Sequence, residues 1–318
     1  MKKIFAGLVL SLLPAAALGA DGVIAPPWAY SATDPGFQRE PDDGLPKHVP
    51  GSDFAFTYAQ ANNRFGGIGD WFPNEHPAMP DIVNKGRAPD VRACVNCHLT
   101  QGLGHPTSGM AAGMPVAYFI QQVKDFQSGK RQSILPERTA GMVKIAKALT
   151  DDEIKSAADY YASLKPVPWV TVKETTMSPV TYVGIEMRHV KPNGGMEPIG
   201  QRVVEVTVDS LSTDMRDPHS GFIAYVPIGA IKKGEALVTT GGNGKTIPCA
   251  ICHGPELKGL GDVPGIAGRL PTYVARQLLD IKQGSRNGTG AQLMKAVVAN
   301  LTEDDIVNIV AYTASRTP

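Results

Sequence analysis

Two short motifs of cysteine and histidine are the residues of this 318-residue chain best suited to chemistry. Each has the pattern C-x-x-C-H: Cys94, Cys97 and His98 in the first copy, and Cys249, Cys252 and His253 in the second. Two thiols at this spacing form thioether bonds to the vinyl groups of one haem, and the adjacent histidine binds the iron from one face. We therefore predict two covalently bound haem c groups.

A C-x-x-C pair also occurs in zinc sites and in redox-active dithiols. The chain has four cysteines, so a zinc site with four thiolate ligands would use both pairs. Such a site would leave the adjacent His98 and His253 without a role, and haem attachment is the favoured interpretation. All four cysteines then bind haem, and none remains for a disulfide.

The two motifs belong to an internal repeat. Residue types recur in the same order at one constant offset after each motif, and Met142 matches Met294 after a small deletion. The pairs at the constant offset are Gly104 and Gly259, Ala112 and Ala267, Gly113 and Gly268, Tyr118 and Tyr273, Gln122 and Gln277, Asp125 and Asp280, Gly129 and Gly284, and Arg131 and Arg286. The repeat predicts two copies of one fold.

The repeat also selects the second axial ligand of each iron. Met142 and Met294 coincide under the repeat and follow His98 and His253 at a similar distance. A methionine sulfur opposite histidine completes the coordination of the iron and raises its potential, although a single methionine more often serves core packing. The competing candidates for the first haem, which have no counterpart in the second copy, are Met110, Met114 and His105.

Arg131 and Arg286 are candidates for contact with the haem propionates. A guanidinium fork matches the geometry of a carboxylate. The alternative for both residues is a solvated position at a helix end.

The pattern of apolar residues indicates several helices around these motifs. We expect a short helix over residues 76–87, a loop over 99–113, a helix over 116–128, and a loop that reaches Met142. Thr150 and Glu153 form a capping box for a helix that ends near residue 165. Residues 230–240 are expected to form the leading helix of the second copy.

Two further segments differ from the repeats in composition. Residues 21–75 are rich in proline, glycine and aromatic residues and show no helical or strand period, which predicts an irregular extension that wraps the first haem domain; a partner-docking arm is the alternative. Residues 166–229 contain β-prone runs at 203–208 and 222–226, which predict a small β-containing connector.

The N-terminus and the composition limit the class of protein. Residues 1–20 have two lysines, a short apolar run and small residues, as in a secretory signal peptide; a membrane anchor is the alternative. A net charge of +1 gives no indication of nucleic-acid binding. No later segment has the length of a membrane span without charges, so we expect an exported protein with no transmembrane segment in the mature chain.

With these motifs, the chain resembles the tandem dihaem cytochromes c of the cytochrome c4 family. The resemblance rests on C-x-x-C-H, A-G-x-x-x-x-Y-x-x-x-Q, G-x-R, and methionine ahead of L-T-x-(D/E)-(D/E)-I, and it covers roughly residues 90–165 and 245–318. It implies a mainly α fold with two class I cytochrome c domains in tandem, at 76–165 and 230–318. It also implies His/Met ligation of both irons and electron transfer in the bacterial periplasm.

Three features depart from the family pattern. The family has proline before the Ala-Gly pair, and its carbonyl orients the haem histidine; Pro264 matches, but the first copy has Gly109, so we expect weaker support for His98. The N-terminal extension and the β-containing connector are the other two. These additions suggest a dedicated partner.

We therefore expect a periplasmic dihaem carrier that transfers electrons between redox proteins. It would accept electrons from a periplasmic dehydrogenase, either as a separate carrier or as the electron-accepting subunit of that enzyme. An oxidase or another cytochrome would be the acceptor. The alternative is an enzyme such as a dihaem peroxidase, which needs one displaceable axial ligand. The pairing of Met142 with Met294 argues against that alternative.

Overall fold

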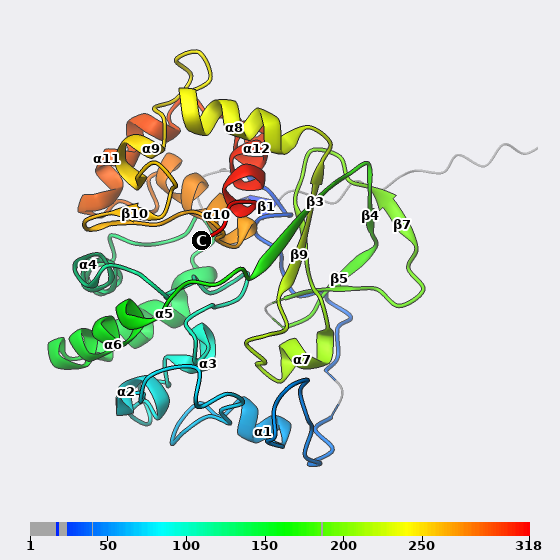
Figure 1. The fold of residues 1–318 in the computed structure, drawn as a ribbon, viewed down its shortest axis with the longest axis vertical. Helices are drawn as coiled ribbons and strands as arrows, with labels where there is room; N and C mark the ends of the chain where they lie inside the picture. Colours follow the sequence, from blue (N-terminus) through cyan, green and yellow to red (C-terminus); the bar gives the residue numbers. More distant parts are fainter. Residues whose placement is uncertain (1–16, 19–23, 40, 186) are drawn as a thin grey trace, which may run out of the picture.

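The computed structural model describes residues 17–18, 24–39, 41–185 and 187–318 (Figure 1). Nearly all of the predicted signal peptide, with its cleavage point, lies outside these residues. Across the described part of the chain, no helix combines the length and the apolar character that a membrane span requires. The fold is mainly helical, with short strands beside two helical units (Figure 1).

The first helical unit contains the first motif. Its elements are α2 (Asp81–Asn84), α3 (Val95–His98), α4 (Val116–Gln127), α5 (Glu137–Ala148) and α6 (Asp151–Ser163). Thr150 caps α6 in a capping box with Glu153, as predicted. Ile154, Ala157 and Tyr161 of α6 are buried in the first core, which they form with α4 and the segment around the motif.

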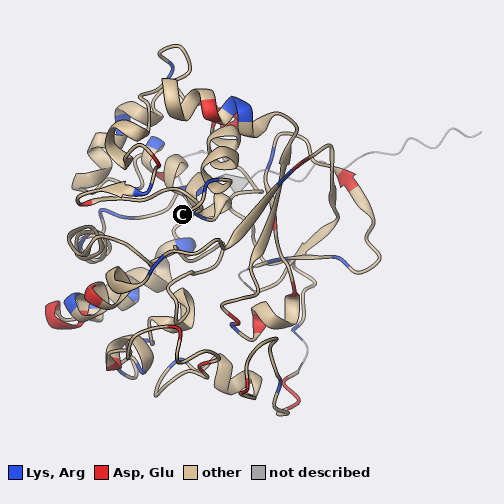
Figure 2. Cartoon of the chain, in the orientation of Figure 1, with Lys and Arg blue, Asp and Glu red and all other residues tan. Residues whose placement is uncertain are grey.

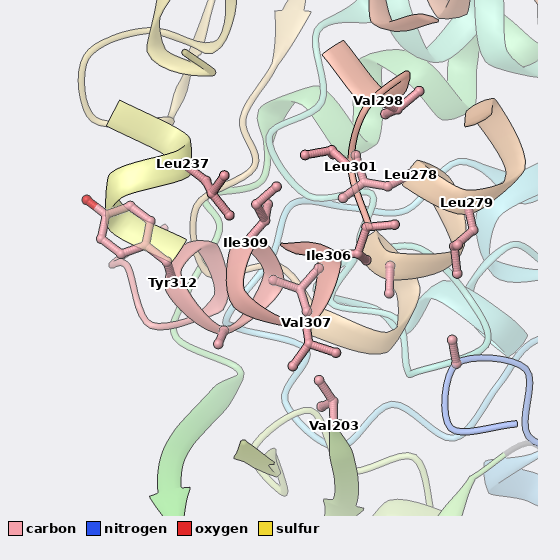
Figure 3. Close-up of a cluster of buried hydrophobic side chains, with 14 of the residues drawn as sticks. Val203, Leu237, Leu278, Leu279, Val298, Leu301, Ile306, Val307, Ile309 and Tyr312 are labelled. Atoms are coloured by element: carbon pink, nitrogen blue, oxygen red, sulfur yellow. The ribbon is translucent and has the colours of Figure 1, made fainter. Parts of the chain in front are cut away.

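The second helical unit repeats this arrangement. Its elements are α8 (Ala230–Thr240), α9 (Ala250–His253), the hairpin of β10 (Gly259–Leu260) and β11 (Val263–Pro264), α10 (Pro271–Lys282), α11 (Thr289–Val298) and α12 (Glu303–Ala314). Helix α12 lies inside the second core, where Ile309 lies beside Leu237 of α8, Ile306 lies on the side of Leu278 of α10, and Val307 faces Val203 (Figure 3). The predicted leading helix over 230–240 is confirmed as α8.

Helices α8 and α12 pack at very short range. A Cβ atom at Gly234 would lie 1.9 Å from the carbonyl oxygen of Asn308. Glycine is therefore required on this face of α8, since any side chain would force the two backbones apart.

The connector forms a three-stranded sheet and two antiparallel strand pairs. The sheet has strand order β3 (Val170–Thr175), β9 (Phe222–Pro227), β8 (Val204–Thr207), with β3 parallel and β8 antiparallel to β9. One pair is the hairpin of β5 (Thr181–Val183) and β6 (Arg188–Val190), and the other joins the flanking strands β4 (Met177–Pro179) and β7 (Met196–Pro198). Helix α7 (Ser210–Asp214) follows β8. Both predicted strand runs are confirmed.

The N-terminal extension reaches both helical units. It contains β2 (Ile24–Ala25) and α1 (Tyr58–Ala61), and β2 pairs with β1 (Ala17–Leu18), which precedes the extension. Trp28 donates from Nε1 to Glu303 of α12 at 2.7 Å, and Tyr30 donates to Asp280 of α10 at 2.8 Å. The expectation that the whole extension wraps the first haem domain is therefore wrong for residues 24–30, which pack on the second core.

Two further local predictions are wrong. The segment before Met142 is not a loop throughout, because α5 begins at Glu137 and carries Met142; its Glu, Arg, Ala, Met and Lys residues are strong helix formers. The helix expected over residues 76–87 is limited to α2. Pro80 precedes it and Gly86 follows it with φ +64°, so both ends are set by residues that leave helical geometry.

Candidate haem sites

Each C-x-x-C-H motif folds as a single helical turn. The amide of His98 donates to the Cys94 carbonyl at 2.9 Å, and the amide of His253 donates to the Cys249 carbonyl at 2.9 Å. Helices α3 and α9 thereby hold the two thiols and the histidine of each motif in one compact turn. The two attachment sites have the same local backbone.

Both histidines are oriented by a backbone carbonyl. His98 Nδ1 lies 2.7 Å from the Gly109 oxygen, and His253 Nδ1 lies 2.7 Å from the Pro264 oxygen. Since a carbonyl only accepts, Nδ1 carries the proton and Nε2 keeps its lone pair, which is the tautomer that binds a metal. The expectation of weaker support for His98 is wrong, because Gly109 supplies the same bond as Pro264.

Burial keeps both imidazoles neutral. It lowers the pKa of His98 and of His253 below the ordinary value, in each case as the largest effect. A neutral imidazole with a free lone pair on Nε2 is chemically suited to bind iron.

The first cysteine of each motif, Cys94 or Cys249, differs from a reactive thiol. Burial raises the pKa of Cys94 to about 12 and that of Cys249 to about 11, so the thiols are protonated. Redox-active and zinc-binding cysteines need the thiolate. Among the described residues, no group of three or more His, Cys, Asp or Glu side chains is arranged to hold a metal ion. The donor set therefore fits haem attachment and not a shared zinc site.

Each candidate methionine borders the same core as the cysteine of its own repeat. Met142 of α5 and Cys94 are partly buried against the first core. Met294 of α11 and Cys249 are partly buried against the second core. The two helices that carry the methionines thus occupy equivalent places in the two units.

The competing ligands for the first haem have other surroundings. His105 is 3% exposed, and its two ring nitrogens lie 3.0 Å and 3.2 Å from the hydroxyl oxygens of Thr107 and Ser108. Met110 is buried in a separate cluster with Trp169. Met114 is partly buried in the loop ahead of α4.

The two candidate propionate contacts bridge the repeats. Arg131 donates to the Tyr273 hydroxyl at 2.8 Å and to Gln277 at 3.2 Å. Arg286 donates to the Tyr118 hydroxyl and to Gln122, both at 2.8 Å, and to Gln277 at 3.1 Å. The residues that recur in the repeat are therefore bonded crosswise, each arginine to the tyrosine and glutamine of the other copy.

Sequence reasoning missed two features beside these sites. The hydroxyl of Tyr161 is buried without a hydrogen-bond partner among the described residues, and its ring lies 6.0 Å from that of His98. Asp280, which sequence analysis noted only as part of the repeat, accepts from the Ser133 hydroxyl at 3.1 Å and from the Ile134 amide at 2.9 Å. A buried hydroxyl with no partner is a feature that a bound polar group would satisfy.

Comparisons with known proteins agree with this chemistry. No protein-family model matches the chain. It is 26% identical over 233 residues to the thiosulfate dehydrogenase electron acceptor of Thiomonas intermedia (strain K12), which covers 72% of this chain and 80% of that protein. It is 31% identical over 149 residues to cytochrome c4 of Azotobacter vinelandii, which covers 41% of this chain and 70% of that protein.

A solved structure of cytochrome c4 from Acidithiobacillus ferrooxidans aligns with 70% of this chain and 98% of its own length, at 23% identity and a TM-score of 0.47. The 31% identity to the Azotobacter protein extends over more than two thirds of that protein's length. It agrees with the two C-x-x-C-H sites and with the matched carbonyl contacts of their histidines. The chain belongs to the cytochrome c4 family of dihaem electron carriers.

Proposed function

We propose that the chain consists of two class I cytochrome c domains in tandem, at residues 76–165 and 230–318. The N-terminal extension of residues 21–75 and the connector of residues 166–229 lie outside this pair. The proposal is supported by the separate core of each helical unit and by the recurrence of the same elements around each motif.

In this proposal each domain attaches one haem c through its own motif. Cys94 and Cys97 form the thioethers in the first domain, and Cys249 and Cys252 form them in the second. When bound, each haem supplies a one-electron couple between ferric and ferrous iron. The observation that carries the proposal is the pair of bonds from His98 and His253 to the Gly109 and Pro264 carbonyls, at the same 2.7 Å.

Four side chains would hold the two irons: His98 and Met142 in the first domain, and His253 and Met294 in the second. The equivalent positions of the two methionines support this assignment. Ligation on both faces leaves no site for substrate, which suits a carrier. Contacts from Arg131 and Arg286 to propionates remain a prediction, alongside the bonds that both residues make to the opposite repeat.

The partner is proposed to be a periplasmic dehydrogenase that donates electrons, with an oxidase or another cytochrome as acceptor. One relative is named an electron acceptor of thiosulfate dehydrogenase, which supports a dehydrogenase of this kind. The periplasm follows from the predicted signal peptide and from c-type haem attachment.

Absorption spectra of the purified ferric and ferrous protein test the proposal, with and without carbon monoxide and cyanide. We expect two low-spin haems per chain, a far-red band from methionine–iron bonds, and no rapid ligand binding. A single haem per chain, or rapid binding at one haem, contradicts it.

A further inference from the structure

We propose that protein redox partners dock on the second repeat, over an apolar patch formed by Ile247, Ile251, Leu260 and Leu293, while in the first repeat the N-terminal extension covers the position that matches Ile251. This inference rests on the proposed electron-carrier function and specifies the surface that it uses.

The four side chains of the apolar patch are unusually exposed. Their exposed fractions are 41% for Ile247, 64% for Ile251, 60% for Leu260 and 78% for Leu293. Large apolar side chains gathered in this way on a surface mark an interaction site.

The patch borders the second attachment site. Ile251 lies between the two cysteines of that motif, and the second of them, Cys252, is itself exposed. Leu293 precedes Met294. A partner that contacts these side chains therefore approaches the second site closely.

The segments that carry the patch are tied to one another. Thr246 donates from its hydroxyl to the Val297 carbonyl of α11 at 2.7 Å. Strand β10, with Leu260, pairs with β11, whose Pro264 holds His253. Helices α9 and α11 and strand β10 lie on the same side of the molecule in Figure 1.

The first repeat has a different surface at the matching positions. Asn96 matches Ile251, is 5% exposed, and donates to the Asn62 and Asn63 carbonyls of the extension at 3.1 Å and 3.3 Å. The Ala93 amide donates to the Arg64 carbonyl at 2.9 Å. The extension is thus bonded directly across the first motif.

The remaining matches also lack exposed apolar side chains. His105 matches Leu260 and is buried, and Gly141 matches Leu293 and has no side chain. Arg92, which matches Ile247, is exposed and charged. The first repeat therefore presents neither the shape nor the polarity of the apolar patch.

The size of the patch indicates a transient partner and not a permanent second copy. Full burial of one Leu or Ile side chain contributes a free energy of about 1.5–3 kcal/mol, at about 25 cal/mol per Å² of apolar surface. One such side chain therefore carries roughly 100 Å² of apolar surface. Because the four side chains are 41–78% exposed, the apolar patch is on the order of 250 Å². At an apolar share of about 57%, this corresponds to roughly 450 Å² of interface per partner, which is below the ~800 Å² of a stable complex and in the range of electron-transfer encounters.

The charges beside the patch are balanced. Lys258 lies 3.6 Å from Glu256, and Lys245 lies 2.5 Å from Asp305. Basic and acidic residues are interspersed along the chain in Figure 2. The partner is therefore a redox protein that presents its own cofactor edge in an uncharged apolar face.

The experiment compares Ile251→Asn and Leu293→Asn with the control Ile228→Asn, in the full-length holoprotein. Ile251→Asn introduces the residue of the first motif, so the sequence remains compatible with haem attachment. Ile228 lies between β9 and α8 and has a similar exposed fraction, 59%. Haem content, spectra and potentials establish that each variant is folded and loaded.

Stopped-flow mixing of the reduced protein with a ferric monohaem cytochrome c, and separately with ferricyanide, measures the exchange of electrons. We expect both patch variants to lower the second-order rate constant with the protein probe about threefold to tenfold, with little change for ferricyanide. Ile228→Asn should match the unmodified protein with both probes.

Each of three outcomes would overturn one claim of the proposal. Equal rates for all variants with the protein probe refute the docking surface but leave the carrier function intact. Absence of electron exchange between the unmodified protein and ferricyanide refutes the proposed function itself. A dimer in sedimentation that Ile251→Asn dissociates shows that a second copy, and not a redox partner, occupies the patch.

Discussion

Arg131 donates to the Tyr273 hydroxyl at 2.8 Å, and the contact is repeated by Arg286 and Tyr118 at the same distance. The two bonds relate the halves of the molecule by an approximate two-fold symmetry. The backbone amide of Arg131 donates to the Asp125 carbonyl, and that of Arg286 donates to the Asp280 carbonyl, both at 3.0 Å. These bonds fix the backbone of each arginine within its own repeat. The repeated residues thus form the junction between the two units.

Loss of one arginine at this junction should weaken the fold. Arg131→Met leaves the Tyr273 hydroxyl without its cationic donor and removes one of the two arginine donors to Gln277, so we expect the free energy of unfolding to fall by about 1–3 kcal/mol. Urea denaturation of the holoprotein measures the change, with the exposed Arg92→Met as control. A double-mutant cycle with Tyr273→Phe should show coupling; strictly additive losses would contradict the contact.

Proline at position 109 should destabilise the protein although the second repeat has proline there. A Cβ at Gly109 would lie 2.6 Å from the Tyr273 hydroxyl oxygen. We expect Gly109→Ala and Gly109→Pro to lower the free energy of unfolding by about 1–3 kcal/mol through overpacking. Combination with Tyr273→Leu should restore part of the loss, and an unchanged midpoint in Gly109→Ala would refute this close contact.

The stability of the protein should depend on the ionisation of Glu205. This residue is 2% exposed, its Oε1 has no hydrogen-bond partner among the described residues, and Oε2 accepts from the Thr272 amide at 3.1 Å. Burial raises the pKa of Glu205 from its ordinary value of 4.5 to about 7. The folded state therefore binds this proton more tightly than the unfolded state, and the stability from this group is lost as pH rises from 4.5 to 7.

Glu205→Gln removes this dependence on pH. We expect the variant to match the unmodified protein near pH 4.5 and to exceed its stability by about 1–3 kcal/mol above pH 7. Thermal or urea unfolding at several pH values measures the difference, with the exposed Glu235→Gln as control. A stability difference that does not change with pH would argue against a titrating Glu205.

Removal of either candidate methionine ligand should expose one iron. We expect Met142→Ala and Met294→Ala each to lose about half of the far-red absorption band and to bind carbon monoxide at one haem. Met196→Ala, at a 57% exposed position in the connector, is the control. A full band in Met142→Ala would move the ligand of the first haem to another of its candidates, which are Met110, Met114 and His105.

The attachment motifs, the repeat and the capping box were accessible from the sequence because each depends on spacing along a short stretch of chain. Thioether attachment needs two cysteines and a histidine within five residues, and one helical turn suffices to present them. The cap at Thr150 needs a partner three residues away. Runs of β-prone residues likewise identified the strands β8 and β9.

Contacts between distant segments were decided by the tertiary structure. The sequence aligned Arg131 with Arg286 but gave no sign that each would bond to the opposite repeat. Gly109 was predicted to weaken the support of His98, whereas its backbone carbonyl makes the same bond as Pro264, because the carbonyl position does not depend on the side chain. The absence of a side chain there instead admits Tyr273.

The N-terminal extension shows the same division. Its composition indicated irregular structure. It did not indicate that Tyr30 would donate a hydrogen bond to Asp280, or that the Asn62 carbonyl would accept one from the Asn96 side chain. Local chemistry depends on neighbours in the chain and can be inferred from their order. Which surface each segment covers depends on how the two cores pack, since burial and hydrogen bonding over long separations are satisfied together only in the folded molecule.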